Sequence, residues 1–145
     1  MSDISVTAGD VHLISGRQLY VASGEAITAG QALARDPDDG LYYLADNDSA
    51  TADRKGITAI ALEAATTANR PIRVQVSGVI YIGGTISVGG IYCVSSTAGG
   101  ICPYADLNAG DDVIIVGVGG SPNAPPHEQQ YKMTLVMRDS AIAKP

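Results

Sequence analysis

Two stretches of this chain, about sixty residues apart, carry nearly the same pattern. The first reads Gly24-Glu25-Ala26-Ile27-Thr28-Ala29-Gly30-Gln31-Ala32-Leu33, followed by a turn ending at Gly40, the segment 41–46 and Gly56-Ile57. The second reads Gly84-Thr85-Ile86-Ser87-Val88-Gly89-Gly90-Ile91-Tyr92, followed by a turn ending at Gly100, the segment 101–106 and Gly117-Val118. Because there are only two copies, the pattern predicts a duplicated β unit and not a solenoid. Each half alone would bury little, so the halves must pack on each other or on another chain.

The composition favours thin, closely spaced sheets. Of the 145 residues, 46% are apolar and 17 are Gly, while Phe and Trp are absent and seven Tyr are the only aromatic residues. Charged residues make up 17%, below the usual share of about a quarter. A surface so poor in charge is typical of subunit contacts. We therefore expect one all-β domain that is built for assembly.

The charge of the chain argues against some classes of partner. The net charge is −6, and the nine basic residues are scattered, which does not suit binding to a phosphate backbone. No apolar run reaches transmembrane length, and the start Met1-Ser2-Asp3 has no signal-peptide pattern. We expect no nucleic-acid partner, no membrane partner and synthesis in a cytoplasm.

Short apolar or alternating runs closed by turn residues predict one strand after another. Segments 11–14 and 19–22 flank Ser15-Gly16-Arg17, which predicts a hairpin, and segments 31–34 and 41–44 flank Asp36-Pro37-Asp38-Asp39-Gly40, which predicts a second. Further strands are predicted at 56–62, at 72–82 with a bulge or bend at Gly78, and at 113–116, where both faces should be buried. We expect an exposed loop at 47–55 and at most one helical turn, at 61–65.

These patterns divide the one domain into three segments. Residues 1–23 form an N-terminal arm and a first hairpin, residues 22–120 a β domain with two related halves, and residues 121–145 a Pro-rich linker and a C-terminal strand. Alternation in the last strand places four side chains on one face: Tyr131, Met133, Leu135 and Met137.

The arm is the candidate contact site of the chain. Its residues 2–7 alternate, so Ile4 and Val6 face the same way and the backbone donors are free. Such a segment either joins the sheet edge of a neighbouring protein or pairs inside its own domain. We expect Ile4 and Val6 to contact a partner in the first case.

The sequence contains no recognisable catalytic or cofactor site. His12 and His127 are the only imidazoles, and neither has the spacing of a nucleophile-base pair. The run Gly117-Val118-Gly119-Gly120 is followed by Pro122 and Pro125, where a phosphate loop would need a helix N-terminus. We read it as a strand end and a turn.

Neither the cysteines nor the acidic turn predicts a metal site. Cys93 and Cys102 flank a turn and should face each other across a hairpin, where a disulfide is sterically conceivable but two buried thiols are expected in a reducing cytoplasm. Five carboxylates lie close in sequence and could offer oxygen ligands to Ca²⁺: Asp36, Asp38, Asp39, Asp46 and Asp48. Their spacing is not that of an EF-hand, so we interpret them as solvated turn residues.

Taken in order, several of these motifs resemble the capsid decoration, or cement, proteins of tailed bacteriophages. The resemblance covers roughly residues 22–119. It rests on residues 24–33, Asp-Gly-Leu-Tyr-Tyr-Leu-Ala-Asp at 39–46, Gly-Ile-Thr-Ala-Ile-Ala at 56–61, Pro-Ile-Arg-Val-Gln-Val-Ser-Gly-Val-Ile at 71–80, Gly-Gly-Thr-Ile-Ser-Val-Gly-Gly-Ile-Tyr at 83–92 and Ala-Gly-Gly-Ile-Cys-Pro at 98–103.

The resemblance implies a small β-barrel, β-tulip or β-clip-like domain that forms homotrimers. It implies a virion protein, made in the host cytoplasm, that sits on the outer capsid surface and bridges major capsid proteins against internal pressure. The alternative is a β-clip-like module that binds a carbohydrate or another ligand, displayed on the virion or at the base of a head fibre. Such a module would have to stack sugars on Tyr20, Tyr42, Tyr43, Tyr81, Tyr92, Tyr104 or Tyr131. An enzyme of the β-clip group has no recognisable motif here.

Overall fold

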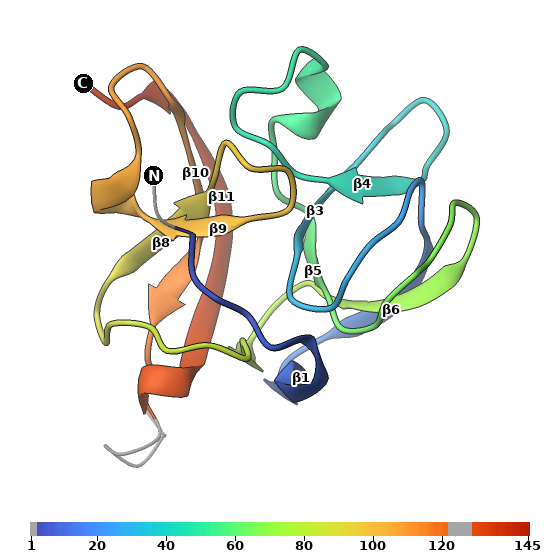
Figure 1. Ribbon diagram of the computed structural model, residues 1–145, viewed down its shortest axis with the longest axis horizontal. Helices are drawn as coiled ribbons and strands as arrows, with labels where there is room; N and C mark the ends of the chain where they lie inside the picture. Colours follow the sequence, from blue (N-terminus) through green and yellow to red (C-terminus); the bar gives the residue numbers. More distant parts are fainter. Residues whose placement is uncertain (1–2, 122–128) are drawn as a thin grey trace.

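The computed structural model describes residues 3–121 and 129–145 of the chain (Figure 1). In these residues it has eleven strands: β1 His12–Ser15, β2 Gln18–Ala22, β3 Ala32–Arg35, β4 Tyr42–Leu44, β5 Ala59–Ala61, β6 Pro71–Gln75, β7 Val79–Tyr81, β8 Ile91–Val94, β9 Ile101–Pro103, β10 Asp112–Gly119 and β11 Lys132–Ala143. Four single turns of 3-10 helix connect them: η1 Ala8–Asp10, η2 Ala52–Arg54, η3 Tyr104–Asp106 and η4 Gln129–Tyr131. The all-β prediction is confirmed.

The strands form two antiparallel sheets. The order in the six-stranded sheet is β1-β7-β11-β10-β8-β9, and the order in the five-stranded sheet is β2-β6-β5-β3-β4. Figure 1 shows the two sheets side by side, with β8 to β11 in one half of the molecule and β3 to β6 in the other. Neither sheet closes into a barrel. Of the architectures that the resemblance implied, the β-barrel is therefore not the one observed.

The two sheets repeat one topology, as the duplicated pattern predicts. Strands β2 to β6 form a first unit in the order β4-β3-β5-β6-β2, and strands β7 to β11 form a second unit in the order β9-β8-β10-β11-β7. The loops before β3 and β8 also match, because Gly30 and Gly89 both have positive φ and donate their amides to the carbonyls of Ala61 and Gly119. Strand β1 is an addition to the second unit.

The strand register gives the equivalent residues of the two units. One row across β3, β5, β6 and β2 consists of Ala32, Ile60, Gln75 and Gln18. The equivalent row across β8, β10, β11 and β7 consists of Ile91, Val118, Thr134 and Val79. Val118 therefore corresponds to Ile60, whereas the sequence comparison had matched it with Ile57.

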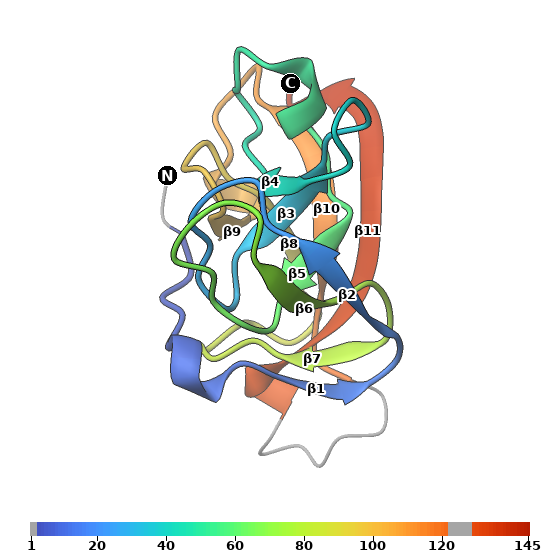
Figure 2. The same cartoon turned by 90° about the vertical axis from the view of Figure 1, so that its right-hand side faces the viewer.

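The first predicted hairpin is wrong. Strands β1 and β2 belong to different sheets, and the chain bends between them at Gly16, just as it bends between β6 and β7 at Gly78 (Figure 2). Both glycines have positive φ, and a Cβ on either would lie about 2 Å from a backbone oxygen of the other bend. The Gln75 side-chain nitrogen lies 2.8 to 3.0 Å from the carbonyls of Ser15, Ser77 and Val79, so it ties the two bends together.

Three apolar clusters hold the sheets. The largest lies between the sheets and includes Ala32 and Ile60 from the first unit with Tyr92, Val116 and Met133 from the second. The second cluster lies on the other face of the five-stranded sheet, and its members are Ile27, Leu33, Tyr42, Ala59, Ala61, Ala65, Ile72 and Val74. The third joins Cys93, Cys102, Leu107 and Val113.

Other local predictions have mixed outcomes. Met133, Leu135 and Met137 pack on the main core as the alternation predicts, and the hairpins β3-β4 and β8-β9 form. Residues 61–65 form no helix, and the expected loop 47–55 contains η2 and the buried Asn47. The predicted linker residues 122–128, with His127, lie outside the described residues.

Candidate interaction surfaces

The N-terminal arm lies against its own domain. The amide of Ile4 donates to the carbonyl of Ile101 at the edge of β9, and the amide of Thr7 donates to the carbonyl of Gly83. Ile4 and Val6 are partly buried and pack on the main core cluster. The arm is not a strand, but its position supports internal packing, the second of the two possibilities.

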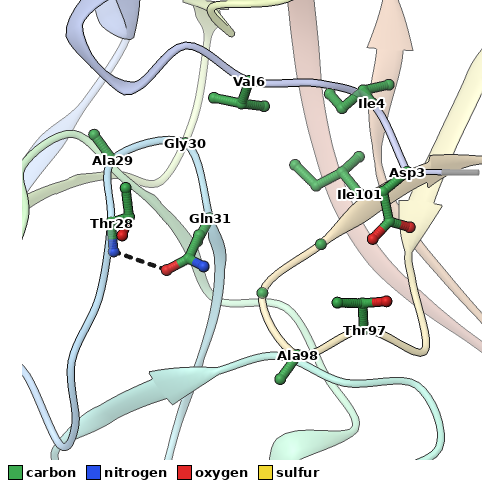
Figure 3. Close-up of a pocket in the computed structure, with 12 residues that line it drawn as sticks. Asp3, Ile4, Val6, Thr28, Ala29, Gly30, Gln31, Thr97, Ala98 and Ile101 are labelled. Atoms are coloured by element: carbon green, nitrogen blue, oxygen red, sulfur yellow. Dashed lines mark hydrogen bonds between the residues drawn. The ribbon is translucent and has the colours of Figure 1, made fainter.

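A cleft of about 260 Å³ lies between the arm, the loop before β3 and the turn between β8 and β9. Figure 3 shows Ile4 beside Ile101, with the Asp3 carboxylate pointing toward the turn that carries Thr97. The Gln31 side-chain oxygen accepts the amide of Thr28 at 2.7 Å. The walls combine small apolar groups with polar ones, among them the side chains of Asp3, Thr28 and Thr97.

A row of uncharged side chains crosses the outer face of the six-stranded sheet. We call Ile91, Val118, Thr134 and Val79 the apolar row. Ile91 is 45% exposed, the other three are partly exposed, and Val136, two residues beyond Thr134 on β11, is 48% exposed. Their neighbours Tyr92, Met133 and Ile80 point into the main core, so alternation directs the row outward.

In the equivalent row of the first unit, three of the four residues are buried, and only Gln18 on the edge strand is exposed. Ala32, Ile60 and Gln75 have no exposed surface, because the second unit packs on this face. The second unit therefore covers its neighbour with one face. On its opposite face Leu107 and Val113 cover Cys93, and the part that carries the apolar row is left exposed by the described residues.

Aromatic rings gather where β1 begins and β7 ends. The ring centroids of His12 and Tyr81 lie 4.8 Å apart and those of Tyr81 and Tyr131 lie 5.8 Å apart, with nearly parallel planes. Tyr81 and Tyr131 line a hollow of about 360 Å³ that also has hydroxyl and carboxylate groups from Thr7 and Asp10. These are the Tyr residues that best fit the predicted ligand-binding alternative.

The acidic turn is held by contacts within the protein. The Tyr43 hydroxyl donates to the Asp39 carboxylate at 2.6 Å and lowers its pKa, and the Arg54 guanidinium lies 3.5 Å from the centre of the Tyr43 ring. Oxygens of Asp36, Asp38 and Asp53 lie within 4.8 Å of one another, so η2 adds a carboxylate that the sequence pattern did not single out. Asp36 and Asp39 accept backbone amides of their own turn, as solvated turn residues do.

Cys93 and Cys102 are directly opposite each other in β8 and β9, as predicted, and both are free and fully buried. Burial raises the pKa of Cys93 to about 11 and that of Cys102 to about 12. His12 has its ring nitrogen Nδ1 2.9 Å from the carbonyl oxygen of Asp10, which is a structural contact. None of the helices in the described part of the chain could span a bilayer.

Comparisons with known proteins returned nothing similar. No family model matches the chain, and neither the curated proteins nor the solved structures contain a match. The residues and the geometry above are therefore the basis for any functional conclusion.

Proposed function

We propose that this protein is a capsid decoration protein that binds the outside of a bacteriophage head as a homotrimer. The observation that carries the proposal is the exposed part of the sheet face that carries the apolar row. In the first unit the same face is buried by the second unit, which indicates that this surface of the unit is made for packing. On a chain with only 17% charged residues, an exposed apolar sheet face favours association.

The proposed activity is mechanical stabilisation. A protein that binds the expanded shell and not its precursor stabilises the expanded state by mass action. When free protein exceeds its dissociation constant about 100-fold, each occupied site adds about 2.7 kcal/mol to the stability of the bound state. A trimer that contacts several shell subunits at once also gains from multivalency. The described residues form two hydrogen-bonded sheets joined by turns, which suit this task.

The test is binding to undecorated heads of the phage whose genome carries the gene. Purified protein is mixed with expanded heads and with unexpanded precursor heads, and the heads are sedimented. We expect saturable binding to expanded heads only, and a higher temperature of head disruption after binding. Absence of binding to expanded heads, or equal binding to precursor heads, would contradict the proposal.

The alternative is a carbohydrate-binding module, and the hollow beside Tyr81 and Tyr131 is the feature that favours it. The same material separates the two functions. Retention on immobilised host glycans, lost in a Tyr131→Ala variant and accompanied by no binding to heads, would support the module and reject decoration.

A further inference from the structure

The outer edge of β2 presents backbone groups that have no hydrogen-bond partner among the described residues. The carbonyl of Arg17 accepts the amide of Val76, and the amide of Ser23 donates to the carbonyl of Arg70, so the odd-numbered residues of this strand bond to β6. The amides and carbonyls of Gln18 and Tyr20 therefore point away from the sheet. The end of this edge differs, because Ser23 is bridged to Tyr42 of β4. Strand β2 is uninterrupted in its pairing with β6 and has no Pro and no charged residue.

The other sheet edges of the described chain are protected. On β4, Tyr42 accepts the amide of Gly24, and the amide of Leu44 donates to the carboxylate of Glu25. On β9, the arm bonds to Ile101, and Pro103 has no amide to offer. The pairing of β1 is irregular between Leu13 and Ser15, which weakens it as a template.

In the second unit, the edge that is equivalent to the outer edge of β2 pairs with an additional strand. Strand β7 is equivalent to β2, and its outer edge is covered by the added antiparallel strand β1. The register makes Tyr81 the equivalent of Tyr20, and Tyr81 is paired and stacked with His12. Tyr20 has no such neighbour and is 71% exposed. The first unit therefore lacks the strand that completes the second.

We propose that the edge of β2 is a strand acceptor, which binds an extended segment of a partner protein by antiparallel β-augmentation. By analogy with β1 on β7, the segment places a planar side chain opposite Tyr20 and an apolar one opposite Leu19. If the proposed function holds, the segment belongs to the major capsid protein. The acceptor edge itself does not depend on that function.

Local charge favours an acidic partner over a second copy of the chain. Between Asp10 and Glu25 the sequence contains Arg17 and no acidic residue, although the net charge is −6. Arg70 lies at the other end of the edge, beside Ser23. Pairing of two β2 strands about Tyr20 would place Arg17 of each copy on the same face as Arg70 of the other, two strands or about 10 Å away. The two guanidinium groups would repel each other. A partner segment with a carboxylate near Arg70 avoids this repulsion.

The probe is a peptide with the sequence of residues 10–16, capped at both ends. When its His12 lies opposite Tyr20, its Asp10 lies near Arg70. We expect saturable binding and slower hydrogen exchange at the amides of Gln18 and Tyr20. The Tyr20→Pro variant removes an outward amide without removing an internal hydrogen bond, so affinity should fall by about tenfold or more. The Tyr20→Thr control keeps the backbone groups and should lose about two- to fivefold.

A peptide N-methylated at its His should not bind, and this keeps the test valid if the Tyr20→Pro variant fails to fold. Absence of saturable binding, or binding without protection of β2 amides, would overturn the proposal. Concentration-dependent dimerisation lost in Tyr20→Pro would assign the edge to a second copy and would also overturn it. Head binding is measured in parallel. Failure of the native protein to bind heads rejects decoration, whereas equal head binding by native protein and Tyr20→Pro rejects only the capsid protein as the partner.

Discussion

The properties of Cys93 and Cys102 are set by their burial more than by their contact with each other. They face each other across one rung of β8 and β9, under Leu107 and Val113. The Lys144 ammonium donates to the carbonyls of Tyr104, Ala105 and Leu107, so the C-terminal residues fasten η3 next to this cluster. Two thiols without contact to water behave as small apolar side chains.

The cysteine pair should be dispensable for folding and should respond to alkaline pH. A variant with Cys93→Ser and Cys102→Ser should fold with a loss of about 1–3 kcal/mol in unfolding free energy, because two small hydroxyls become buried. Native thiols should react with Ellman's reagent only on unfolding.

The sign of the pH effect follows from the raised pKa values. The folded chain holds both thiol protons to about pH 11 and 12, against a reference value of 9.0, so stability is full below pH 9 and decreases as pH rises through this range. Urea midpoints between pH 8 and 10.5 should fall more for the native chain than for the double variant. Equal slopes, or a native disulfide that survives purification, would contradict this account.

Residue roles could be predicted from sequence where the cause is local. The facing cysteines follow from a turn between two strands, and the turn aspartates follow from the Asp-Pro-Asp-Asp-Gly pattern. Gln75 and Asn47 were missed. Each is a polar residue whose burial and backbone partners come from segments far away in the sequence, and no local pattern marks them.

Among the elements, the arm replaces a segment that the first unit has and the second lacks. In the first unit, Gly24 bonds to Tyr42 on the edge of β4, and in the second, Ile4 bonds to Ile101 on the edge of β9. A Cβ on Gly84 would lie 2.3 Å from the Ser5 carbonyl oxygen, so the arm lies directly on this loop. The arm thus completes the second unit.

A variant that starts at Gly9 should be folded but less stable. Loss of the partly buried Ile4 and Val6 and of the two backbone hydrogen bonds that join the arm to Ile101 and Gly83 should cost about 2–4 kcal/mol in unfolding free energy. Amide exchange should accelerate in β9 and in the loop at 83–84. A matched variant that lacks only residues 1 and 2 should keep the native stability. If the variant starting at Gly9 kept native stability and lost head binding, Ile4 and Val6 would be partner contacts.

The prediction of strand pairing succeeded where the residues of the turn decide it. It failed where strands that are distant in sequence decide it. The β3-β4 turn contains Pro37 and Gly40, and its hairpin formed as predicted. The Ser15-Gly16-Arg17 segment also places a Gly between two apolar runs, yet Gly16 is a bend between sheets, because β1 and β2 pair with β7 and β6. Nothing near Gly16 in the sequence indicates that Gly78 lies against it.

For the whole molecule, the duplication was visible in the sequence, but the way the units stack was not. The sheets pack with different faces: the first unit contributes the face with Ala32 and Ile60, and the second contributes the opposite face, with Tyr92 and Met133. Ala32 and Ile91 are equivalent in register, yet one is fully buried and the other is 45% exposed. Face-to-back stacking of two units leaves one such face uncovered, and a closed oligomer is one way to cover it.

The proposed trimer should therefore depend on the apolar row. The variants Ile91→Glu and Val136→Glu each place a carboxylate on a surface that is exposed in one chain. The free energy of unfolding of the single chain should therefore change by less than about 0.5 kcal/mol. Burial of that carboxylate between subunits would cost several times more, and sedimentation equilibrium at micromolar concentration should shift from trimer to monomer. Ile142→Glu is the matched control: Ile142 is 66% exposed on the same strand as Val136, about 20 Å further along it, and the trimer should persist. A native protein that is monomeric under these conditions, or row variants that remain trimeric, would show that this face is not the subunit contact. In the second case the exposed row would remain available for the shell, and the same two variants would then be expected to lose head binding while the Ile142→Glu control keeps it.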